Sequence, residues 1–365
     1  MESCSELLNH HNYLYIAGAG SRAKTLKGYL DFLYPGARVV SFLVDSLAEN
    51  DSFIDRIPVL ELRGENLQHK EYPVFIATKG IRHKMISEAL QKAGMKIIIP
   101  VTPEVDNELR NQYVRRKFGS GNRKFVKIEE LVCQPKIKGR IYVVRSICDK
   151  PLQTTYVRQP YEREIQAGAA LTRERLQPDI LTDCEGDNIS AKNRQYCELT
   201  VLYWLWKHAE EDVIGMAHYR RHFILPDNWM EFMQNYDIDV ILPVPTYVSP
   251  NVSENYKERH DAREWDYLMA YLCKNSKEDY ETACEVFQGN LYLPCNMFIL
   301  KKAVLNELCS WLFPILDAVV IYGGKKEDDY LNRYPGFLSE RLITLFFYKY
   351  KDRFKIVYAD KSFQQ

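Results

Sequence analysis

The chain has 365 residues, of which 46% are hydrophobic and 27% charged, so its composition is ordinary for a globular protein long enough for two domains. Lysine plus arginine number 49, as do aspartate plus glutamate, and the net charge is zero. This balance argues against a dedicated nucleic-acid-binding protein, which would normally be basic, and against a long charged tail.

The sequence predicts neither a targeting segment nor a membrane span. Residues 1–11 are polar and lack the apolar stretch of a secretory signal. The most apolar long window, residues 303–322, includes two acids and a proline, so we interpret it as a buried helix followed by a strand or loop. The nine cysteines form no CxxC pair. We therefore expect a cytoplasmic protein with reduced thiols.

The first part of the chain, residues 1–104, has the pattern of a parallel βαβ domain. A strand at 13–17 is followed by the GxGxxA pattern of residues 18–23, a helix to Leu33, and a second strand at 39–44. Further elements are predicted as strands at 57–60, 72–77 and 95–100 and a helix at 81–93. This order is typical of a Rossmann-like domain, whose glycines let the backbone approach a phosphate at a helix N-terminus.

We predict an N-terminal nucleotide-binding site made by Gly18, Gly20, Ser21 and Asp45. Plain helix–strand packing is the alternative for the glycines, and NAD is a rival ligand. Residues 16–20, 40–45 and 57–60 resemble the N-terminal domain of bacterial sugar O-acyltransferases, which binds a nucleotide-sugar. The hexapeptide-repeat half of that family has no counterpart here, so the resemblance does not imply acyl transfer.

The most basic stretch of the chain lies at residues 105–137. It begins with a predicted helix at 105–117, continues through a Gly-Ser-Gly-Asn break at 119–122, and its basic residues include Arg110, Arg115, Arg116, Lys117, Arg123, Lys124 and Lys127. We interpret it as a solvated linker. The alternative is peripheral contact with the anionic inner face of a membrane or with a diphosphate lipid head group.

The remaining part, residues 138–365, begins with a strand at 138–144 and an acid-rich loop at 181–190, whose Ser190 is predicted to cap a helix at 193–208. A buried strand at 212–217 then ends in the sequence His-Tyr-Arg-Arg-His. Ligands of open α/β sheets bind at strand C-termini, and arginine offers a planar fork for phosphate oxygens. Because side chains alternate along a strand, we expect only one of the two arginines to face the ligand.

Two alternatives exist for this His-Tyr-Arg-Arg-His segment. The arginines could belong to an ion-pair network, and His218 with His222 could bind zinc, although HxxxH spacing on a strand disfavours zinc. The pair Asp237 and Asp239 has DxD spacing, but these acids precede their strand and therefore lie at the wrong end of the sheet for a metal site.

Near the C-terminus, a strand is predicted at 296–299 and a helix at 301–312. Residues 333–336 then lead into an apolar helix that opens with Glu340 and Arg341. Such a pair at a helix start can be a capping ion pair. Alternatively, Glu340 could hold or activate an acceptor hydroxyl, as a general base does.

These residues belong to a wider resemblance that covers about 225 residues. It is carried by residues 186–190, 193, 197–200, 203–207, 214–215, 218–221, 296–299, 311–314 and 336–342, among which HYRR and GFLSERL are the most specific motifs. They resemble a bacterial domain of unknown function found in capsular and exopolysaccharide glycosyltransferases. That domain is similar to GT-A-type glycosyltransferases, and related members are implicated in galactofuranose transfer.

The resemblance implies an α/β protein with two Rossmann-like domains, the C-terminal one of GT-A type. It implies catalytic roles for His218, Arg220, Arg221 and Glu340. It also implies a donor site made by Asp183, Asp187, Asn188, Glu198, Tyr219, Asn296 and Arg341. Because the strand ends in HYRR rather than in a DxD pair, no metal cofactor is required. If Mn²⁺ or Mg²⁺ binds, Asp183 and Asp187 are its candidate ligands.

The expected reaction is sugar transfer from a UDP-sugar, such as UDP-galactose or UDP-galactofuranose, to a surface-polysaccharide acceptor. A lipid-linked acceptor would place the protein at the cytoplasmic face of the membrane. Two other functions stay open. One is an NAD-dependent oxidoreductase or epimerase that uses the glycine motif, and the other is a non-catalytic nucleotide-sugar-binding module of a polysaccharide assembly complex.

Overall fold

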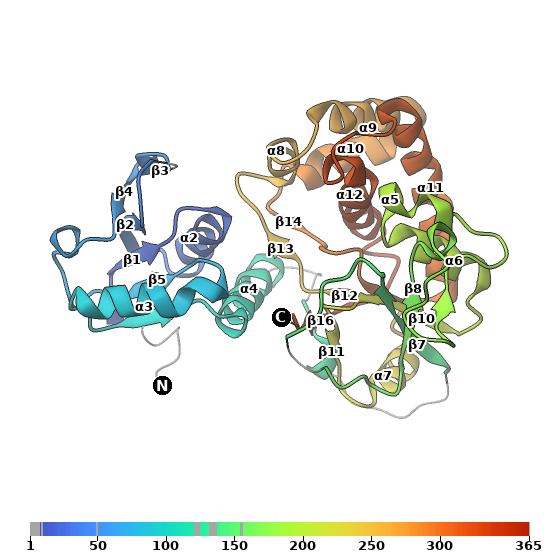
Figure 1. The fold of residues 1–365 in the computed structure, drawn as a ribbon, viewed down its shortest axis with the longest axis horizontal. Helices are drawn as coiled ribbons and strands as arrows, with labels where there is room; N and C mark the ends of the chain where they lie inside the picture. The colour runs from blue at the N-terminus through green and yellow to red at the C-terminus, as the bar shows by residue number, and fades with distance from the viewer. Residues whose placement is uncertain are drawn as a thin grey trace. The chain divides into compact units, whose positions relative to one another are not determined.

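The computed structural model describes residue 8 and residues 10–48, 50–119, 125–130, 137–153 and 156–364. The chain divides into two compact units (Figure 1). Unit 1 comprises Met1–Lys124 with Tyr247–Ser249, and unit 2 comprises Phe125–Thr246 with Pro250–Gln365. The predicted loop at 120–124 lies outside the described residues.

Unit 1 is built on a six-stranded sheet in the order β3-β4-β2-β1-β5-β6. Its strands are β1 (Tyr13–Ala17), β2 (Arg38–Val44), β3 (Phe53–Ile54), β4 (Ile57–Glu61), β5 (Val74–Ile76) and β6 (Ile98–Pro100). All pairs are parallel except that of β3 with β4. The helices are α2 (Ser21–Leu33), α3 (His83–Lys92) and α4 (Pro103–Phe118). The prediction of a Rossmann-like domain is therefore confirmed.

The turn from β1 to α2 requires glycine at its first position. Gly18 has φ +117, and a Cβ atom there would lie 2.9 Å from the Ala77 carbonyl oxygen. Only glycine adopts this conformation without strain while allowing β5 to approach so closely. The turn therefore places the N-terminus of α2 directly above the C-terminal edge of the sheet.

Helix α4, which was predicted as part of a free linker, packs on unit 1. Thr102 caps its N-terminus, and its buried face includes Leu109, Tyr113 and Val114. The Tyr113 ring lies 4.6 Å from that of Phe32 on α2. Arg110 is also buried and pairs with Asp106 at 3.6 Å, so not all of the basic residues form an exposed cationic surface.

Unit 2 contains an eight-stranded mixed sheet in the order β11-β16-β12-β15-β10-β7-β8-β9. Its strands are β7 (Gly139–Arg145), β8 (Glu162–Gln166), β9 (Leu181–Thr182), β10 (Val213–His218), β11 (Phe223–Ile224), β12 (Val240–Pro243), β15 (Phe298–Lys301) and β16 (Ile356–Lys361). Strands β9, β8, β7 and β10 run parallel, and β15 is antiparallel to β10 and β12. The short strands β13 (Thr246–Tyr247) and β14 (Leu291–Tyr292) lie outside this sheet.

The helices of unit 2 cover both faces of the sheet (Figure 1). They are α5 (Asn193–Tyr196), α6 (Leu199–His208), α7 (Trp229–Asn235), α8 (Val252–Lys257), α9 (Ala262–Asn275), α10 (Lys277–Phe287), α11 (Lys302–Gly323) and α12 (Tyr334–Lys349). Trp229 of α7 packs with Ile141 and Ile299 in one core cluster. Gly215 is central to this core, because a Cβ there would lie 2.8 Å from Ile141 Cγ1 and 3.0 Å from Ile299 Cγ1.

The structure corrects three predictions of local structure. The helix predicted at 193–208 is broken at Cys197, which has φ +51, into α5 and α6. Ser190 does not cap the following helix, because its hydroxyl donates to Asp183 instead. Helix α12 begins at Tyr334, so Glu340 and Arg341 lie in its second turn and do not cap it.

The apolar window at 303–322 is one continuous helix, α11, with Pro314 inside it. We had expected this helix to end earlier and be followed by a strand or loop. In the described part of the chain, α11 alone is long and apolar enough to cross a membrane, by length and composition only. Half of its most apolar window is buried inside the protein, which is typical of a core helix.

Candidate functional site

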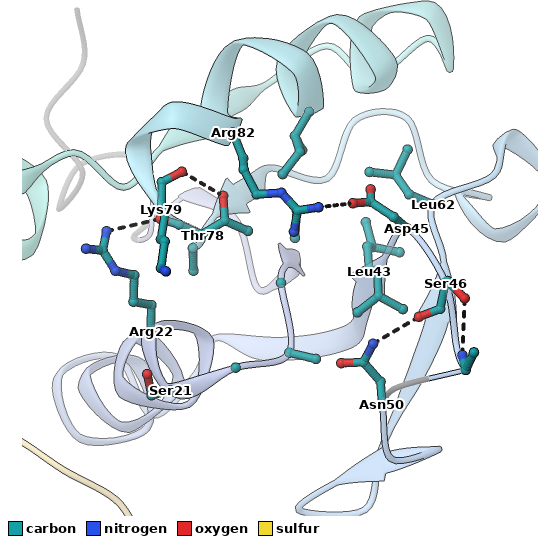
Figure 2. A pocket seen from close by; sticks show the side chains of 18 residues that line it. Ser21, Arg22, Leu43, Asp45, Ser46, Asn50, Leu62, Thr78, Lys79 and Arg82 are labelled. Carbon is teal, nitrogen blue, oxygen red and sulfur yellow. Dashed lines mark hydrogen bonds and ion pairs between the residues drawn. The ribbon is translucent and has the colours of Figure 1, made fainter. Parts of the chain in front are cut away.

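Unit 1 contains a cavity of about 750 Å³ at the C-terminal edge of its sheet (Figure 2). The C-terminal ends of β1, β2 and β5 meet there. This is the point where the sequence order of the strands in the sheet reverses, between β1 and β5. Gly18, Gly20, Ser21 and Asp45, the four residues predicted for this site, all line the cavity. Its position is where open α/β sheets bind ligands.

Three cations and one acid line this cavity: Arg22, Lys79, Arg82 and Asp45. Arg82 Nη2 lies 3.1 Å from Asp45 Oδ2, and Arg22 Nη1 donates to the Thr78 carbonyl at 3.1 Å. Sequence reasoning missed Lys79 and Arg82, although their position just after the strand at β5 could have indicated them. The cavity therefore combines a glycine turn with an excess of positive charge, which suits an anionic ligand.

In unit 2, the loop acids predicted to bind the donor or a metal have different environments. Asp183 is fully buried, and its carboxylate accepts four hydrogen bonds. The donors are Gly168 N at 2.9 Å, Ala169 N at 3.0 Å, Ser190 Oγ at 2.5 Å and Thr200 Oγ1 at 2.5 Å. A carboxylate has about four lone-pair sites. Asp183 is thus saturated and does not suit a metal ligand.

The other two loop residues predicted for the donor site, Asp187 and Asn188, also form hydrogen bonds within the protein. The Asn188 amide donates to the carbonyls of Cys184 and Gly186 and accepts from the Ser190 N–H, so it shapes the turn. Asp187 is exposed and accepts from the Tyr203 hydroxyl at 3.0 Å. Among the described residues, no three His, Cys, Asp or Glu side chains are grouped as a metal site would require. Of the two candidate metal ligands, only Asp187 therefore has an exposed carboxylate.

The strand β10 delivers His218 to the C-terminal edge of the sheet, as predicted, and residues 218–222 then form a tight turn. His218 Nε2 lies 2.5 Å from the Cys295 carbonyl oxygen, so this nitrogen carries the proton. Burial lowers the pKa of His218, and the charge of Glu198 opposes this shift. His222 is buried elsewhere, with Nδ1 2.8 Å from Glu162 Oε1, so the two histidines do not form the HxxxH zinc site.

The two arginines of the turn have different surroundings. Arg220 donates weakly to the Lys150 carbonyl at 3.4 Å and lies over the Tyr219 ring. Arg221 lies over the Phe363 ring, with its guanidinium carbon 5.3 Å from the ring centroid. Within the described residues, neither arginine forms an ion pair, so the predicted alternative of an ion-pair network is not found there. The backbone of Arg221 pairs with that of His218, and His218 and Glu340 both bind the backbone of Cys295, so Arg221 belongs to the same cluster.

Asn296 links the elements that converge on this turn. Its amide donates to Glu198 Oε1 at 2.7 Å and to the Gly336 carbonyl at 3.1 Å, and it accepts from Ser339 Oγ at 2.7 Å. The segment before β15, the start of α6 and the start of α12 are thereby held together. The structure therefore brings together the predicted residues Glu198, His218, Asn296 and Glu340.

Glu340 occupies the centre of this cluster. Its Oε1 accepts from the Cys295 N–H at 2.5 Å, and its Oε2 pairs with Arg341 Nη1 at 2.7 Å. Burial raises the pKa of Glu340, and Arg341 and the Cys295 N–H only partly offset this effect. A carboxylate with a raised pKa is a suitable proton acceptor near neutral pH. Arg341 is only 3% exposed and lies 4.2 Å over the Tyr292 ring, so it supports Glu340 from inside the protein.

Three of the six non-glycine residues that have a positive φ in the described part of the chain belong to this cluster. Cys197, Cys295 and Asn296 have φ values of +51, +70 and +49, although none is glycine. Such conformations cost about 1–3 kcal/mol each and often occur at functional sites. Sequence reasoning missed Cys295, because no pattern predicts that its backbone N–H and carbonyl bind Glu340 and His218.

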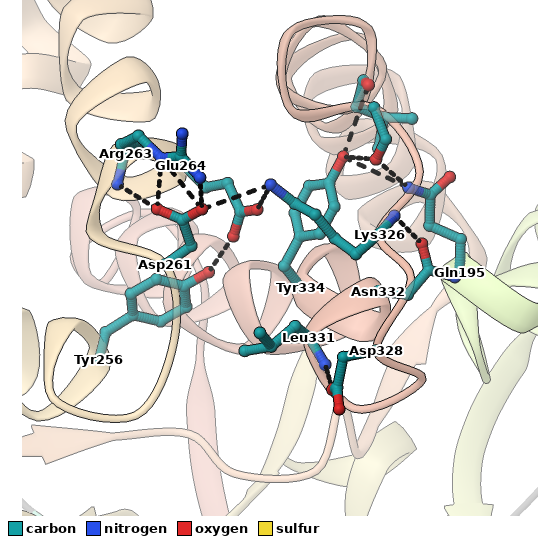
Figure 3. Close-up of polar contacts among 12 residues, drawn as sticks. Gln195, Tyr256, Asp261, Arg263, Glu264, Lys326, Asp328, Leu331, Asn332 and Tyr334 are labelled. Atoms are coloured by element: carbon teal, nitrogen blue, oxygen red, sulfur yellow. Dashed lines mark hydrogen bonds and ion pairs between the residues drawn. The ribbon is translucent and has the colours of Figure 1, made fainter.

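A buried polar network holds the segment that leads into α12 (Figure 3). Lys326 lies 2.8 Å from Glu264 Oε1 and 3.4 Å from Asp261 Oδ2. Gln195 donates to the Tyr334 hydroxyl at 3.3 Å, which ties α5 to the first residue of α12. This network fixes the start of the helix that carries Glu340.

Three comparisons relate the chain to known proteins. A family model described as a domain of unknown function (DUF4422) matches residues 141–351. No curated protein matches the chain. A solved apo structure of the bifunctional glycosyltransferase WbbM is similar, with a TM-score of 0.53 and 24% identity. The similarity covers 62% of this chain and 45% of that one, so the chain corresponds to less than half of WbbM. The likeness confirms the predicted α/β fold of GT-A type.

Proposed function

The chain belongs to the DUF4422 family, and we propose that its C-terminal unit is a glycosyltransferase that takes a UDP-sugar donor and a saccharide acceptor. The fold similarity to a glycosyltransferase supports this proposal. The surroundings of Arg221 are the observation that supports the proposal most directly. Arg221 is a half-buried arginine at the C-terminal edge of the sheet, with no ion-pair partner among the described residues, and its backbone pairs with His218, which binds the same Cys295 backbone as Glu340. Such an arginine suits a diphosphate.

In the proposed reaction, Arg221 binds the diphosphate oxygens and stabilises the negative charge that develops as UDP leaves. An acceptor hydroxyl forms the new bond to the anomeric carbon while the bond from that carbon to the diphosphate breaks. The hydroxyl proton passes to Glu340, and the electron pair leaves with UDP. This role of Glu340 belongs to an inverting transfer. No metal is needed for any of these steps, because the arginine supplies the positive charge.

The other predicted residues would serve the same site. His218 donates from Nε2 to the Cys295 carbonyl and so orients the segment that contains Cys295. Asn296, the next residue of that segment, donates to Glu198 and holds its carboxylate in place. We propose that Glu198 meets donor sugar hydroxyls and is held by Asn296, which is 1% exposed and donates both amide hydrogens within the protein, and that Tyr219 and Arg220 flank the diphosphate. Asp183 and Asn188 instead shape the loop, and exposed Asp187 is the predicted loop acid that could contact the nucleoside.

The finer parts of the proposal concern the substrates. We propose UDP-galactose or UDP-galactofuranose as donor and a surface polysaccharide, such as capsule, exopolysaccharide or O-antigen, as the product. A lipid-linked acceptor would place the reaction at the cytoplasmic face of the membrane, with peripheral contact through the exposed basic residues Arg115 and Lys117 of α4.

A second site is favoured by the cavity of unit 1. We propose that it binds a nucleotide or nucleotide-sugar, with phosphates near the N-terminus of α2 and the cations Arg22, Lys79 and Arg82. The rival ligand is NAD, which would imply an oxidoreductase or epimerase. A non-catalytic role of the whole protein in polysaccharide assembly is the other rival.

The experiment that tests the transferase proposal measures UDP release from UDP-galactose and UDP-galactofuranose, with and without EDTA. Turnover that persists in EDTA and is lost in Arg221→Met would support it. Turnover that requires Mn²⁺, or that Arg221→Met leaves unchanged, would contradict the proposed role of Arg221. Reduction of NAD by the protein with any of these sugars would favour the oxidoreductase instead.

A further inference from the structure

The turn that carries Arg221 is held from inside the protein by a buried polar group. Glu162 at the start of β8 is 6% exposed and lies 2.8 Å from His222 Nδ1. The Tyr156 hydroxyl donates to both Glu162 oxygens, at 3.0 and 2.9 Å, and the Tyr156 ring stacks on His222 at 3.6 Å. Burial alone would raise the pKa of Glu162, but the hydrogen bonds from His222 and from the Gln159 N–H lower it. The base of the turn is therefore rigid.

The outer side of the same turn is held by the segment that follows β16. Ser362 N donates to the His222 carbonyl at 2.9 Å, and Gln364 N donates to the Arg220 carbonyl at 2.8 Å. These two hydrogen bonds continue the pairing of β16 with β11, in which Lys361 faces Phe223. The residue between the two donors, Phe363, lies under the Arg221 guanidinium.

This contact leaves the charge of the Arg221 side chain available. A cation–π contact attracts the guanidinium without neutralising its charge, so that charge can still bind phosphate oxygens. The guanidinium carbon of Arg221 lies 5.3 Å from the Phe363 centroid. Phe363 is 47% exposed, so burial of its apolar surface explains the position of its ring only in part.

We propose that Phe363 is a positioning residue that holds the Arg221 guanidinium ready to bind the donor diphosphate. The inference rests on the proposed glycosyltransferase function and deepens it. The ring restricts the rotamers of Arg221 before the ligand arrives, so that less freedom is lost on binding. Phe363 itself touches neither donor nor acceptor, and its effect passes through Arg221.

The experiment is a calorimetric measurement of UDP affinity for the full chain and five variants. Phe363→Leu removes the aromatic face but keeps apolar volume, and Phe363→Trp keeps an aromatic face. Tyr322→Leu is the matched control, because Tyr322 is a similarly exposed aromatic side chain at the end of α11. Arg221→Met, alone and combined with Phe363→Leu, completes a double-mutant cycle. Thermal unfolding of each variant checks that it is folded.

Phe363→Leu is expected to weaken UDP binding by about two- to fivefold, which is the range of an exposed cation–π contact. Phe363→Trp should restore the affinity, Tyr322→Leu should not change it, and Phe363→Leu should have no further effect in the Arg221→Met background. Equal affinities of the wild type and Phe363→Leu, or an equal loss in the Arg221→Met background, would overturn the inference alone. Absence of UDP binding by the wild type would overturn the proposed function and this inference with it.

Discussion

Asp183 and Arg221 are charged residues that sequence reasoning assigned to one site, yet their side chains have opposite surroundings. Asp183 is buried and receives four hydrogen bonds, so its charge is used within the protein. Arg221 is half-buried and, among the described residues, has an aromatic ring but no carboxylate as partner. The number of protein partners thus distinguishes a structural charge from one that is available to a ligand.

We predict that Asp183→Asn is a stability variant rather than a binding variant. The substitution removes the charge and presents an NH₂ group to donors, so the free energy of unfolding should fall by about 2–3 kcal/mol. Urea denaturation measures this change. Asp187→Asn is the control and should stay within about 0.5 kcal/mol of the wild type, because Asp187 is exposed. Unchanged stability of Asp183→Asn with loss of Mn²⁺ binding would contradict this role.

A pH prediction follows from the raised pKa of Glu340. As a base, Glu340 must be ionised, so the rate of sugar transfer should fall as the pH decreases through its pKa, which desolvation raises above the ordinary value of a glutamate. The pH profile of kcat should therefore show an acidic limb above that value. Glu340→Gln should be slow at every pH and lack this limb. A profile that is identical in wild type and Glu340→Gln would exclude Glu340 as the base.

At the scale of elements, hydrophobic periodicity predicted five of the six sheet strands of unit 1, four of the eight of unit 2, and the helix after the glycine motif. It could not predict the break at Cys197. This residue adopts a left-handed φ because long-range contacts hold it there: Asn193 Nδ2 donates to its carbonyl, and Arg333 Nε donates to its Sγ. The sequence also could not predict that the Asp183 carboxylate has all of its hydrogen-bonding sites occupied, because the donors come from three separate segments.

The glycine motif allows a prediction with an internal control. Gly18→Ala should destabilise the protein by about 1–3 kcal/mol, because its φ of +117 is strained for alanine and the new Cβ would lie 2.9 Å from the Ala77 carbonyl oxygen. Gly20→Ala should leave stability nearly unchanged, because φ is −81 and no atom lies within 4 Å of its Cβ position. Urea denaturation compares the two. If Gly20→Ala also leaves binding of every nucleotide unchanged, the cavity of unit 1 does not use this turn.

At the scale of the whole molecule, the two units each present a site at the C-terminal edge of a sheet, but only unit 2 is covered by the family match at residues 141–351. The sequence predicted both of these sheet edges, because the order of elements along the chain and the polar residues that follow each strand are local features. It could not show that the turn with Arg221 and His218 meets the Cys295 segment that binds Glu340, since this depends on how α12 and the segment before β15 fold around the turn.

The most direct test of the central claim is calorimetric titration of UDP into Gly20→Asp protein, with and without Arg221→Met. Gly20→Asp places a negative charge in the cavity of unit 1 and thereby isolates the site of unit 2. We predict that Gly20→Asp protein binds UDP without added metal and that Arg221→Met weakens this binding by about tenfold or more. Loss of all UDP binding with Gly20→Asp alone, or equal binding with and without Arg221→Met, would contradict a donor site at Arg221.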